Sequence, residues 1–263
     1  MKILQDYIVP VVRTDTDDRG IAVKGLFGTA FFINSRGVFV TARHVIENCE
    51  ADVVANGGRI GLVMRKPGDN KYRYHTDIVH FTCHDPPYDV AVGVADKPST
   101  AAFLFGEECK VLVWDDVYTA GYPETAMHQL ADQFRIDARG HKGQVLRKLP
   151  PGHFLVHPHP DVIELSFPIT KGLSGAPLVL RDQHDADGNP LPYFVLIGVC
   201  VGNQPSEIVD FSHTEVTEEG NEFKETKSRI EEYGIAHDIR PLADWRPACL
   251  GDMTLRDAIQ PNN

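Results

Sequence analysis

A serine lies between two glycines in the stretch KGLSGAPLV, which runs from Lys171 to Val179. Glycine and serine are common turn residues and the residues after them favour a strand, so one interpretation is a tight turn before a strand. The other interpretation is nucleophilic chemistry, in which the turn presents Ser174 and lets backbone N–H groups face a reacting carbonyl. Serine is a weak nucleophile unless a base takes its proton, so residues elsewhere must decide between the two.

Two further residues could supply such a base and the carboxylate that orients it. His44 follows the apolar stretch VFVTA, where a strand gives way to a turn, and a lone histidine there could equally cap a helical turn. Asp89 directly precedes the alternating stretch VAVGVA, where an aspartate is often a turn or cap residue. The chain order His, Asp, Ser, with each residue at the junction of a strand and a turn, favours catalysis over three separate structural roles.

Short strand-like segments that could position these residues recur through the sequence. YIVPVV, IAVKGLF, TAFFI and VFVTA all lie in the first 42 residues, and similar segments follow as far as YGIAHDI. Helices are predicted only near the end, around LADW and MTLRDAI. Many short strands at close spacing predict an all-β protein of the sandwich or barrel type.

An acidic stretch between Asn203 and Tyr233 interrupts this pattern. It contains nine acidic and three basic residues, which is too polar for a core. We therefore expect a long surface excursion between two strands. A domain boundary is expected near residues 107–116, between two strand-rich halves.

Composition limits what the protein is expected to bind. Of the 263 residues, 42% are hydrophobic and 24% are charged, which is ordinary for a globular protein. The net charge of −11 argues against general binding to nucleic acid, which needs a basic surface. No apolar run approaches the ~20 residues of a membrane span, and Gln5 and Asp6 interrupt the region where a signal peptide would be apolar. We therefore expect a cytoplasmic protein that binds neither a membrane nor nucleic acid.

Cysteines and histidines do not follow standard metal or disulfide patterns. The five cysteines are odd in number, widely spaced and include no CxxC pair, which favours a reduced protein without zinc. The histidine-containing stretches HTDIVHFTCH and GHFLVHPHP lack ligand spacing for zinc, and RDQHDADGNP lacks it for calcium. No metal or cofactor is expected.

The run GTAFFI and GVFVTARHVI, then YDVAVGVA, GYP and GLSGAPLV, resembles the trypsin-like serine peptidases of the chymotrypsin fold, and among them the bacterial branch with the HtrA-type proteases. The resemblance extends from about Ile21 to Ile239. It implies an all-β fold of two packed six-stranded antiparallel β-barrels with a short C-terminal helix. The implied parts are an N-terminal barrel at 1–112 with the His and Asp, a C-terminal barrel at 113–240 with the Ser, and a helical tail at 241–263. Because the tail is short, no PDZ domain of the kind found in HtrA-type proteases is expected.

The same resemblance assigns a role to each candidate residue. It implies that His44 is the general base and then acid, that Asp89 orients it, and that Ser174 is the nucleophile. The backbone N–H groups of Gly172 and Ser174 would form the oxyanion hole. Leu173 replaces the aspartate that secreted members use for activation by cleavage, so that activation switch is not expected. The implied substrate-binding residues are Pro168, Thr170, Lys171, Val201, Gly202, Asn203 and Gly234.

We therefore expect a serine endopeptidase that cleaves a protein or peptide substrate through an acyl-enzyme, without a metal or cofactor. Pro168 stands where an aspartate would select a basic side chain, so a small or apolar side chain is expected next to the cleaved bond. The acidic excursion would flank this pocket and either gate the cleft or attract basic residues of the substrate. A dedicated regulatory partner is a further expectation. Two alternatives stay open: a catalytically silent peptide-binding module of the same fold, and an acyl hydrolase that cleaves esters.

Overall fold

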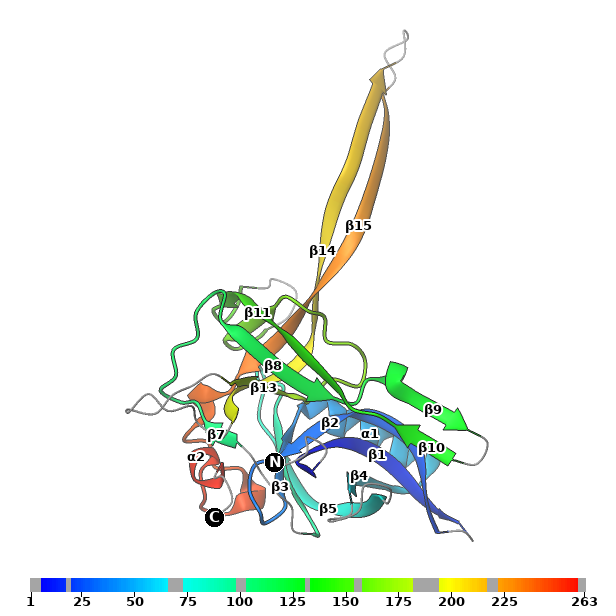
Figure 1. The fold of residues 1–263 in the computed structure, drawn as a ribbon, viewed down its shortest axis with the longest axis vertical. Coiled ribbons are helices and arrows are strands. Elements are labelled where there is room, and N and C mark those ends of the chain that lie inside the picture. Colours follow the sequence, from blue (N-terminus) through cyan, green and yellow to red (C-terminus); the bar gives the residue numbers. More distant parts are fainter. Residues whose placement is uncertain are drawn as a thin grey trace.

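The structure, a computed structural model, describes residues 6–17, 20–65, 73–97, 103–130, 133–153, 158–181, 194–216 and 222–259. Its strands form two β-units that lie side by side, and a long hairpin projects from one of them (Figure 1). None of the helices in these residue ranges is long and apolar enough to cross a membrane.

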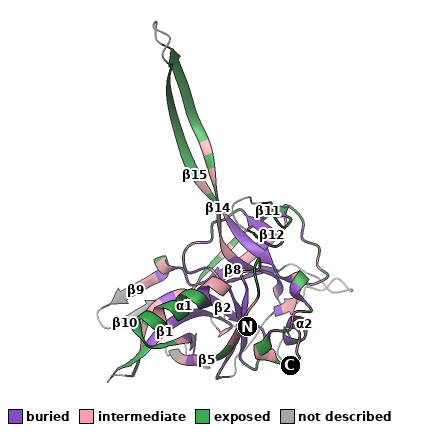
Figure 2. Ribbon diagram, turned by 180° about the vertical axis from the view of Figure 1, so that it is seen from behind, coloured by how far each residue is buried: buried purple, intermediate pink, exposed green. Residues whose placement is uncertain are grey.

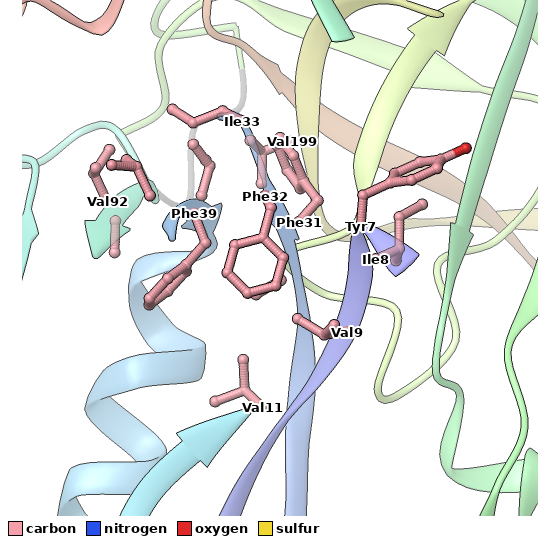
Figure 3. Close-up of a cluster of buried hydrophobic side chains, with 14 of the residues drawn as sticks. Tyr7, Ile8, Val9, Val11, Phe31, Phe32, Ile33, Phe39, Val92 and Val199 are labelled. Atoms are coloured by element: carbon pink, nitrogen blue, oxygen red, sulfur yellow. The ribbon is translucent and has the colours of Figure 1, made fainter. Parts of the chain in front are cut away.

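The first unit is a closed antiparallel barrel in the order β1-β2-β3-β6-β5-β4. Its strands are β1 (Ile8–Asp17), β2 (Gly20–Phe32), β3 (Val38–Thr41), β4 (Arg59–Arg65), β5 (Arg73–Cys83) and β6 (Ala91–Ala95). Phe31, Phe32 and Phe39 are fully buried in its core, among valine and isoleucine side chains (Figure 3). The turn between β2 and β3 is closed by the side chain of Asn34, whose Oδ1 accepts hydrogen bonds from the backbone N–H groups of Arg36 and Val38 at 2.9 and 3.3 Å.

The second unit is a ring of strands with one strand added at its edge. Its order is β13-β8-β11-β12-β15-β14-β7, and an extra β13–β14 pairing closes the ring. The strands are β7 (Phe103–Phe105), β8 (Asp116–Gly121), β11 (Arg139–Leu149), β12 (Val162–Leu165), β13 (Pro177–Leu180), β14 (Phe194–Val216) and β15 (Glu222–Asp238). The prediction of an all-β, chymotrypsin-like fold is thus confirmed, with the added detail that β7 pairs in parallel with β14.

The helices differ from the sequence-based prediction in one place. The prediction that helices occur only near the end is wrong, because α1 (Arg43–Asn56) begins directly after β3. Only Val45, Ile46 and Cys49 of α1 are buried, so its apolar pattern is weak in the sequence. The predicted C-terminal helix is α2 (Leu255–Ala258), which starts with a capping box between Thr254 and Asp257. Among the described residues, short 3-10 turns and a separate hairpin are also present: η2 (Glu124–Ala126), η3 (Arg240–Leu242), η4 (Ala248–Leu250), β9 (Met127–Leu130) and β10 (Gln133–Ile136).

The acidic excursion forms regular structure, as a two-stranded ribbon. We call the ribbon residues 204–216 of β14 and 222–233 of β15, which pair antiparallel from Gln204 opposite Tyr233 to Val216 opposite Glu222. The ribbon extends away from both β-units instead of folding over them (Figure 1). This position does not suit the expected role of a gate over the cleft.

Candidate active site

His44 and Asp89 are held together by two hydrogen bonds. His44 is the second residue of α1, and Asp89 lies in the loop between β5 and β6. Asp89 Oδ2 is 2.5 Å from His44 Nδ1, and Asp89 Oδ1 accepts the backbone N–H of His44 at 2.9 Å. The carboxylate therefore fixes both the position of the ring and the proton on Nδ1, which leaves Nε2 of the neutral ring as an acceptor.

Burial and hydrogen bonding shift the pKa of the Asp89 carboxyl in opposite directions. Burial alone would raise the pKa of its carboxyl, but the hydrogen bonds and charge of His44 outweigh burial, and the pKa lies below its ordinary value. Asp89 is therefore ionised at neutral pH and accepts both hydrogen bonds from His44.

The turn that carries Ser174 is folded against the first barrel. Gly172 and Gly175 have φ angles of +94° and +85°, a region that favours glycine. A Cβ atom on Gly175 would lie 2.1 Å from the carbonyl oxygen of Thr29 and 3.0 Å from the backbone nitrogen of Ala42. Ala42 is two residues before His44, so the turn brings Ser174 beside the start of α1.

Hydrogen bonds also set the direction of two peptide groups in this turn. The carbonyl of Lys171 accepts from the N–H of Glu124 at 2.9 Å, and the carbonyl of Leu173 accepts from the N–H of Ala176 at 3.0 Å. In a trans peptide the N–H points opposite to the C=O, so the following N–H groups, of Gly172 and Ser174, point away from these partners. Neither N–H has a hydrogen-bond acceptor within the described residues, so both remain available to a ligand.

Thr29 of β2 ties the turn to the first barrel. Its backbone N–H donates to the carbonyl of Ser174 at 2.8 Å, and its hydroxyl donates to the carbonyl of Gly172 at 2.7 Å. The same hydroxyl accepts the N–H of Tyr122 at 2.9 Å. Sequence reasoning did not single out Thr29, because a threonine within a strand pattern gives no signal of its partners.

The Ser174 hydroxyl donates to the carbonyl of Val201 at 3.4 Å. No hydrogen bond joins it to His44 in the part of the chain that the structure describes. A rotation of the serine side chain would be needed to direct its proton to His44 Nε2. Catalytic hydrogen bonds are often long or misaligned without substrate and tighten when it binds.

The residues predicted to bind substrate form three neighbouring segments. Asn203 bridges two of them: its Oδ1 accepts from the N–H of Ile169 at 2.6 Å, and its Nδ2 donates to the carbonyl of Ile169 at 3.1 Å. Gly234 donates from its N–H to the carbonyl of Phe167 at 2.9 Å, which joins the third segment. These hydrogen bonds hold the three segments against one another.

The other predicted substrate-binding residues lie around this bridge. Pro168 and Lys171 are exposed, and the Lys171 ammonium pairs with Glu124 at 2.8 Å. Thr170 accepts the N–H of Leu173 through its carbonyl at 2.9 Å. Gly202 is half-buried beside Val201, at a register shift between β14 and β15.

A second histidine accepts a hydrogen bond from the backbone of Asp89. His237 of β15 is buried, and its Nδ1 accepts the backbone N–H of Asp89 at 3.0 Å. Burial lowers the pKa of His237 to about 4, although the Asp89 carboxylate acts in the opposite direction. The ring is therefore neutral at pH 7, as an acceptor at Nδ1 requires. No sequence pattern connects His237 with Asp89.

The free energy of unfolding should fall as the pH drops from about 6.5 to about 4. An unfolded histidine takes up a proton near pH 6.5, whereas folded His237 does so only near pH 4, so the unfolded chain binds more protons in this window. The resulting loss is roughly 3 kcal/mol from this residue. The lowered pKa of Asp89 acts in the same direction.

Urea unfolding at a series of pH values would measure this contribution. In His237→Asn the amide oxygen can still accept the N–H of Asp89 but cannot titrate, so the decline should become shallower. His213→Asn, which changes an exposed histidine of the ribbon, should keep the wild-type slope. Equal slopes for wild type and His237→Asn would contradict the assignment.

Within the described residues, no three His, Cys, Asp or Glu side chains are grouped so that they could hold a metal ion. The acidic stretch from Asp182 to Gly188 and His157 lie outside the described residues.

The closed barrel, the second ring and their arrangement define a chymotrypsin-like fold. The sequence matches the trypsin-like peptidase domain over residues 28–185, more than half of the chain, and the protein belongs to this family. No curated protein matches the sequence significantly.

Two solved structures are similar in fold. The HtrA-type protease AlgW with a decapeptide has a TM-score of 0.51 and 17% identity, covering 90% of this chain and 62% of the AlgW chain. An inactive form of a serine-to-alanine mutant of Rv3671c from M. tuberculosis H37Rv has a TM-score of 0.45 and 16% identity, covering 89% of this chain and 82% of that one. The chain thus spans less than two thirds of the AlgW chain.

Proposed function

We propose that the protein is a serine endopeptidase in which Ser174 is the nucleophile, His44 the general base and Asp89 the residue that orients His44. The observation that carries this proposal is the pair of hydrogen bonds from His44 to Asp89, which leaves Nε2 as the free acceptor next to the Ser174 turn. Membership of the trypsin-like peptidase family supports it.

In the proposed reaction, His44 takes the proton of the Ser174 hydroxyl as the serine oxygen attacks a substrate carbonyl. The N–H groups of Gly172 and Ser174 would stabilise the negative charge on the carbonyl oxygen, at about 3–4 kcal/mol for each donor. His44 then returns its proton to the leaving amine, and water hydrolyses the acyl-enzyme through the same base. Ionised Asp89 stabilises the imidazolium that forms in both steps.

A peptide is the substrate class that we propose. AlgW, which shares the fold, was solved with a decapeptide. The edge of β14 at Val201 is free of a strand partner beside Ser174, so an extended peptide could pair there. We further propose that the protein acts in the cytoplasm, since its five cysteines are free thiols, as a reducing compartment would keep them.

A fluorophosphonate probe tests the proposed nucleophile. The wild-type protein should become labelled covalently and Ser174→Ala should not, and a peptide library should be cleaved only by the wild type. Ser212→Ala, in the ribbon, is a matched control that should keep full labelling. No labelling of the wild type would favour a silent peptide-binding module, and turnover of esters without cleavage of peptides would favour an acyl hydrolase.

Asn203 should restrict the side chain accepted next to the cleaved bond. Its two hydrogen bonds to Ile169 span the proposed pocket, so wild type should prefer glycine, alanine or serine there. In Asn203→Gly the pocket opens, and kcat/KM for a leucine or phenylalanine substrate relative to alanine should rise about tenfold or more.

Profiling peptides that differ only at this residue would measure the change. Gln204→Gly removes the neighbouring side chain of β14, which donates only to the carbonyl of Pro205 within the described residues, and should leave the preference unchanged. Equal preferences in wild type and Asn203→Gly would place the selecting contact elsewhere.

A further inference from the structure

The ribbon is a protruding surface whose two strands have no third partner in the described residues. β14 also pairs with β13 and β7, and β15 with β12, but these pairings end at Val199 and Gly234. Figure 2 shows that the ribbon is mostly exposed and stands away from the rest of the molecule. Both outer edges of the ribbon are therefore open.

A two-stranded hairpin is marginally stable in water, and a third strand or a packed face is needed for more. The ribbon lacks a packed face, because large apolar side chains are exposed along it. Their exposed fractions reach 62% for Phe223 and 70% for Ile230. Val209, Phe211 and Val216 are the other exposed members. These side chains favour an additional strand beside the ribbon.

The outer edge of β15 has a complete set of donors and acceptors. The N–H groups of Gly234 and Asp238 donate to Phe167 and Asp161, away from β14. The backbone N–H and C=O groups of successive residues point to alternate edges of a strand. Those of the even-numbered residues from Glu222 to Glu232 therefore also point to the outer edge, away from β14. None of them is proline, and β15 pairs without an extra residue of its own.

The outer edge of β14 is less suited to pairing. Pro205 lies opposite Glu232, so its missing N–H falls on the outer edge. A register shift between Val209 and Phe211 leaves Asp210 as an extra residue that interrupts the strand. Proline and bulges protect strand edges from pairing, so β15 is the edge that can accept a partner.

We propose that two copies of the chain pair antiparallel through their β15 edges, about a twofold axis at Thr226, to form a four-stranded sheet. In this register Glu225 lies opposite Lys227 of the second copy, and Phe223 lies opposite Arg229. Both contacts occur twice because of the symmetry. Glu225 and Lys227 have no ion-pair partner within the described residues of their own chain, so pairing supplies one.

The charged side chains of β15 favour this pairing register over registers with the twofold axis at a neighbouring residue. A twofold axis perpendicular to the sheet keeps each side chain on its face, so the axis must pass through a residue. An axis at Lys227 places Lys227 opposite its own copy and Glu222 opposite Glu232. An axis at Ser228 places Glu225 opposite Glu231. An axis at Arg229 places that residue opposite its own copy. Among axes from Lys224 to Arg229, only the one at Thr226 avoids opposed like charges.

A single cysteine at the proposed axis gives a direct test on the full chain. Residues opposite each other in a hydrogen-bonded antiparallel pair have Cα atoms about 5.5 Å apart, a distance that a disulfide spans. Thr226→Cys should therefore form a disulfide-linked dimer under mild oxidation. Ser212→Cys lies opposite Thr226 on β14, at the same height of the ribbon but on the other edge, and should not. The native cysteines are common to both variants.

Light scattering over a range of protein concentrations would measure the dimer without a crosslink. Thr226→Pro removes an outward N–H in each copy and should raise the dimer Kd about tenfold or more, whereas Ser212→Pro should not. Glu225→Lys should weaken the dimer, and adding Lys227→Glu should restore it. A monomer at all concentrations would overturn the proposal, and so would equal crosslinking of the two cysteine variants.

Discussion

Asp89→Asn should lower kcat about 10⁴-fold, as expected when the histidine of a triad is held in the wrong tautomer. One oxygen of Asp89 accepts the backbone N–H of His44, and an asparagine must place its amide oxygen there to keep that bond. Its NH₂ group then faces His44 Nδ1, which becomes the acceptor and moves the ring proton to Nε2. A protonated Nε2 cannot take the proton of Ser174, so the proposed general base is lost.

Turnover of a peptide substrate and the rate of fluorophosphonate labelling would measure this loss. Both should fall, while KM and the free energy of unfolding should change little, because the side chains have the same shape. Asp85→Asn changes an exposed carboxylate in the same loop and should keep the wild-type rates. A decrease of less than tenfold in Asp89→Asn would show that Asp89 does not set the state of His44.

The sequence was sufficient to predict the fold and the main site candidates because these depend on local patterns. Short apolar strands between turns predicted an all-β fold, the resemblance to the trypsin-like peptidases implied two barrels, and the order of His44, Asp89 and Ser174 suggested one site. The structure brings His44 to Asp89 and the Ser174 turn to the start of α1. These contacts join residues far apart in the chain, but each of the three lies at a strand end that the sequence marks.

Other parts of the site depend on pairing between segments that carry no such mark. Asn203 contacts Ile169 only because a register shift in β14 and the ring closure bring these segments together. His237 reaches Asp89 from a different β-unit. The helix α1 was missed because only three of its side chains are buried. Tertiary packing, which the sequence does not display, decides these features.

The structure of the ribbon was also only partly predictable from the sequence. Its charge content predicted exposure, but a polar composition does not distinguish a loop from a paired hairpin. The polar residues of β15 from Lys224 to Arg229 suit a strand with two solvent-exposed faces as well as a loop. Only the antiparallel pairing from Gln204 to Val216, with Asp210 as its one extra residue, shows that this stretch is a hairpin with an open edge.

Gly175→Ala should destabilise the protein by more than about 4 kcal/mol, because it combines strain with a clash that neither β-unit can relieve. The φ angle of +85° is costly for alanine, and the new Cβ would lie 2.1 Å from the carbonyl oxygen of Thr29 and 2.3 Å from Thr41 Oγ1. The carbonyl belongs to β2, a strand paired on both sides in the first barrel. Relief therefore requires the turn to move away from the barrel, which would also separate Ser174 from His44.

Two other glycines separate strain from clash in this experiment. Gly57 has a φ angle of +76° and a ψ angle of −172° with open space around it, so Gly57→Ala should cost about 1–3 kcal/mol for strain alone. Gly202 has neither a positive φ nor a close neighbour, so Gly202→Ala should change the free energy of unfolding by less than about 0.5 kcal/mol. Urea unfolding of the three variants measures all three costs. If Gly175→Ala lowers the free energy of unfolding no more than Gly57→Ala does, the turn does not pack tightly against the first barrel. Other contacts, first among them those of Thr29, would then set the distance between the proposed nucleophile and base.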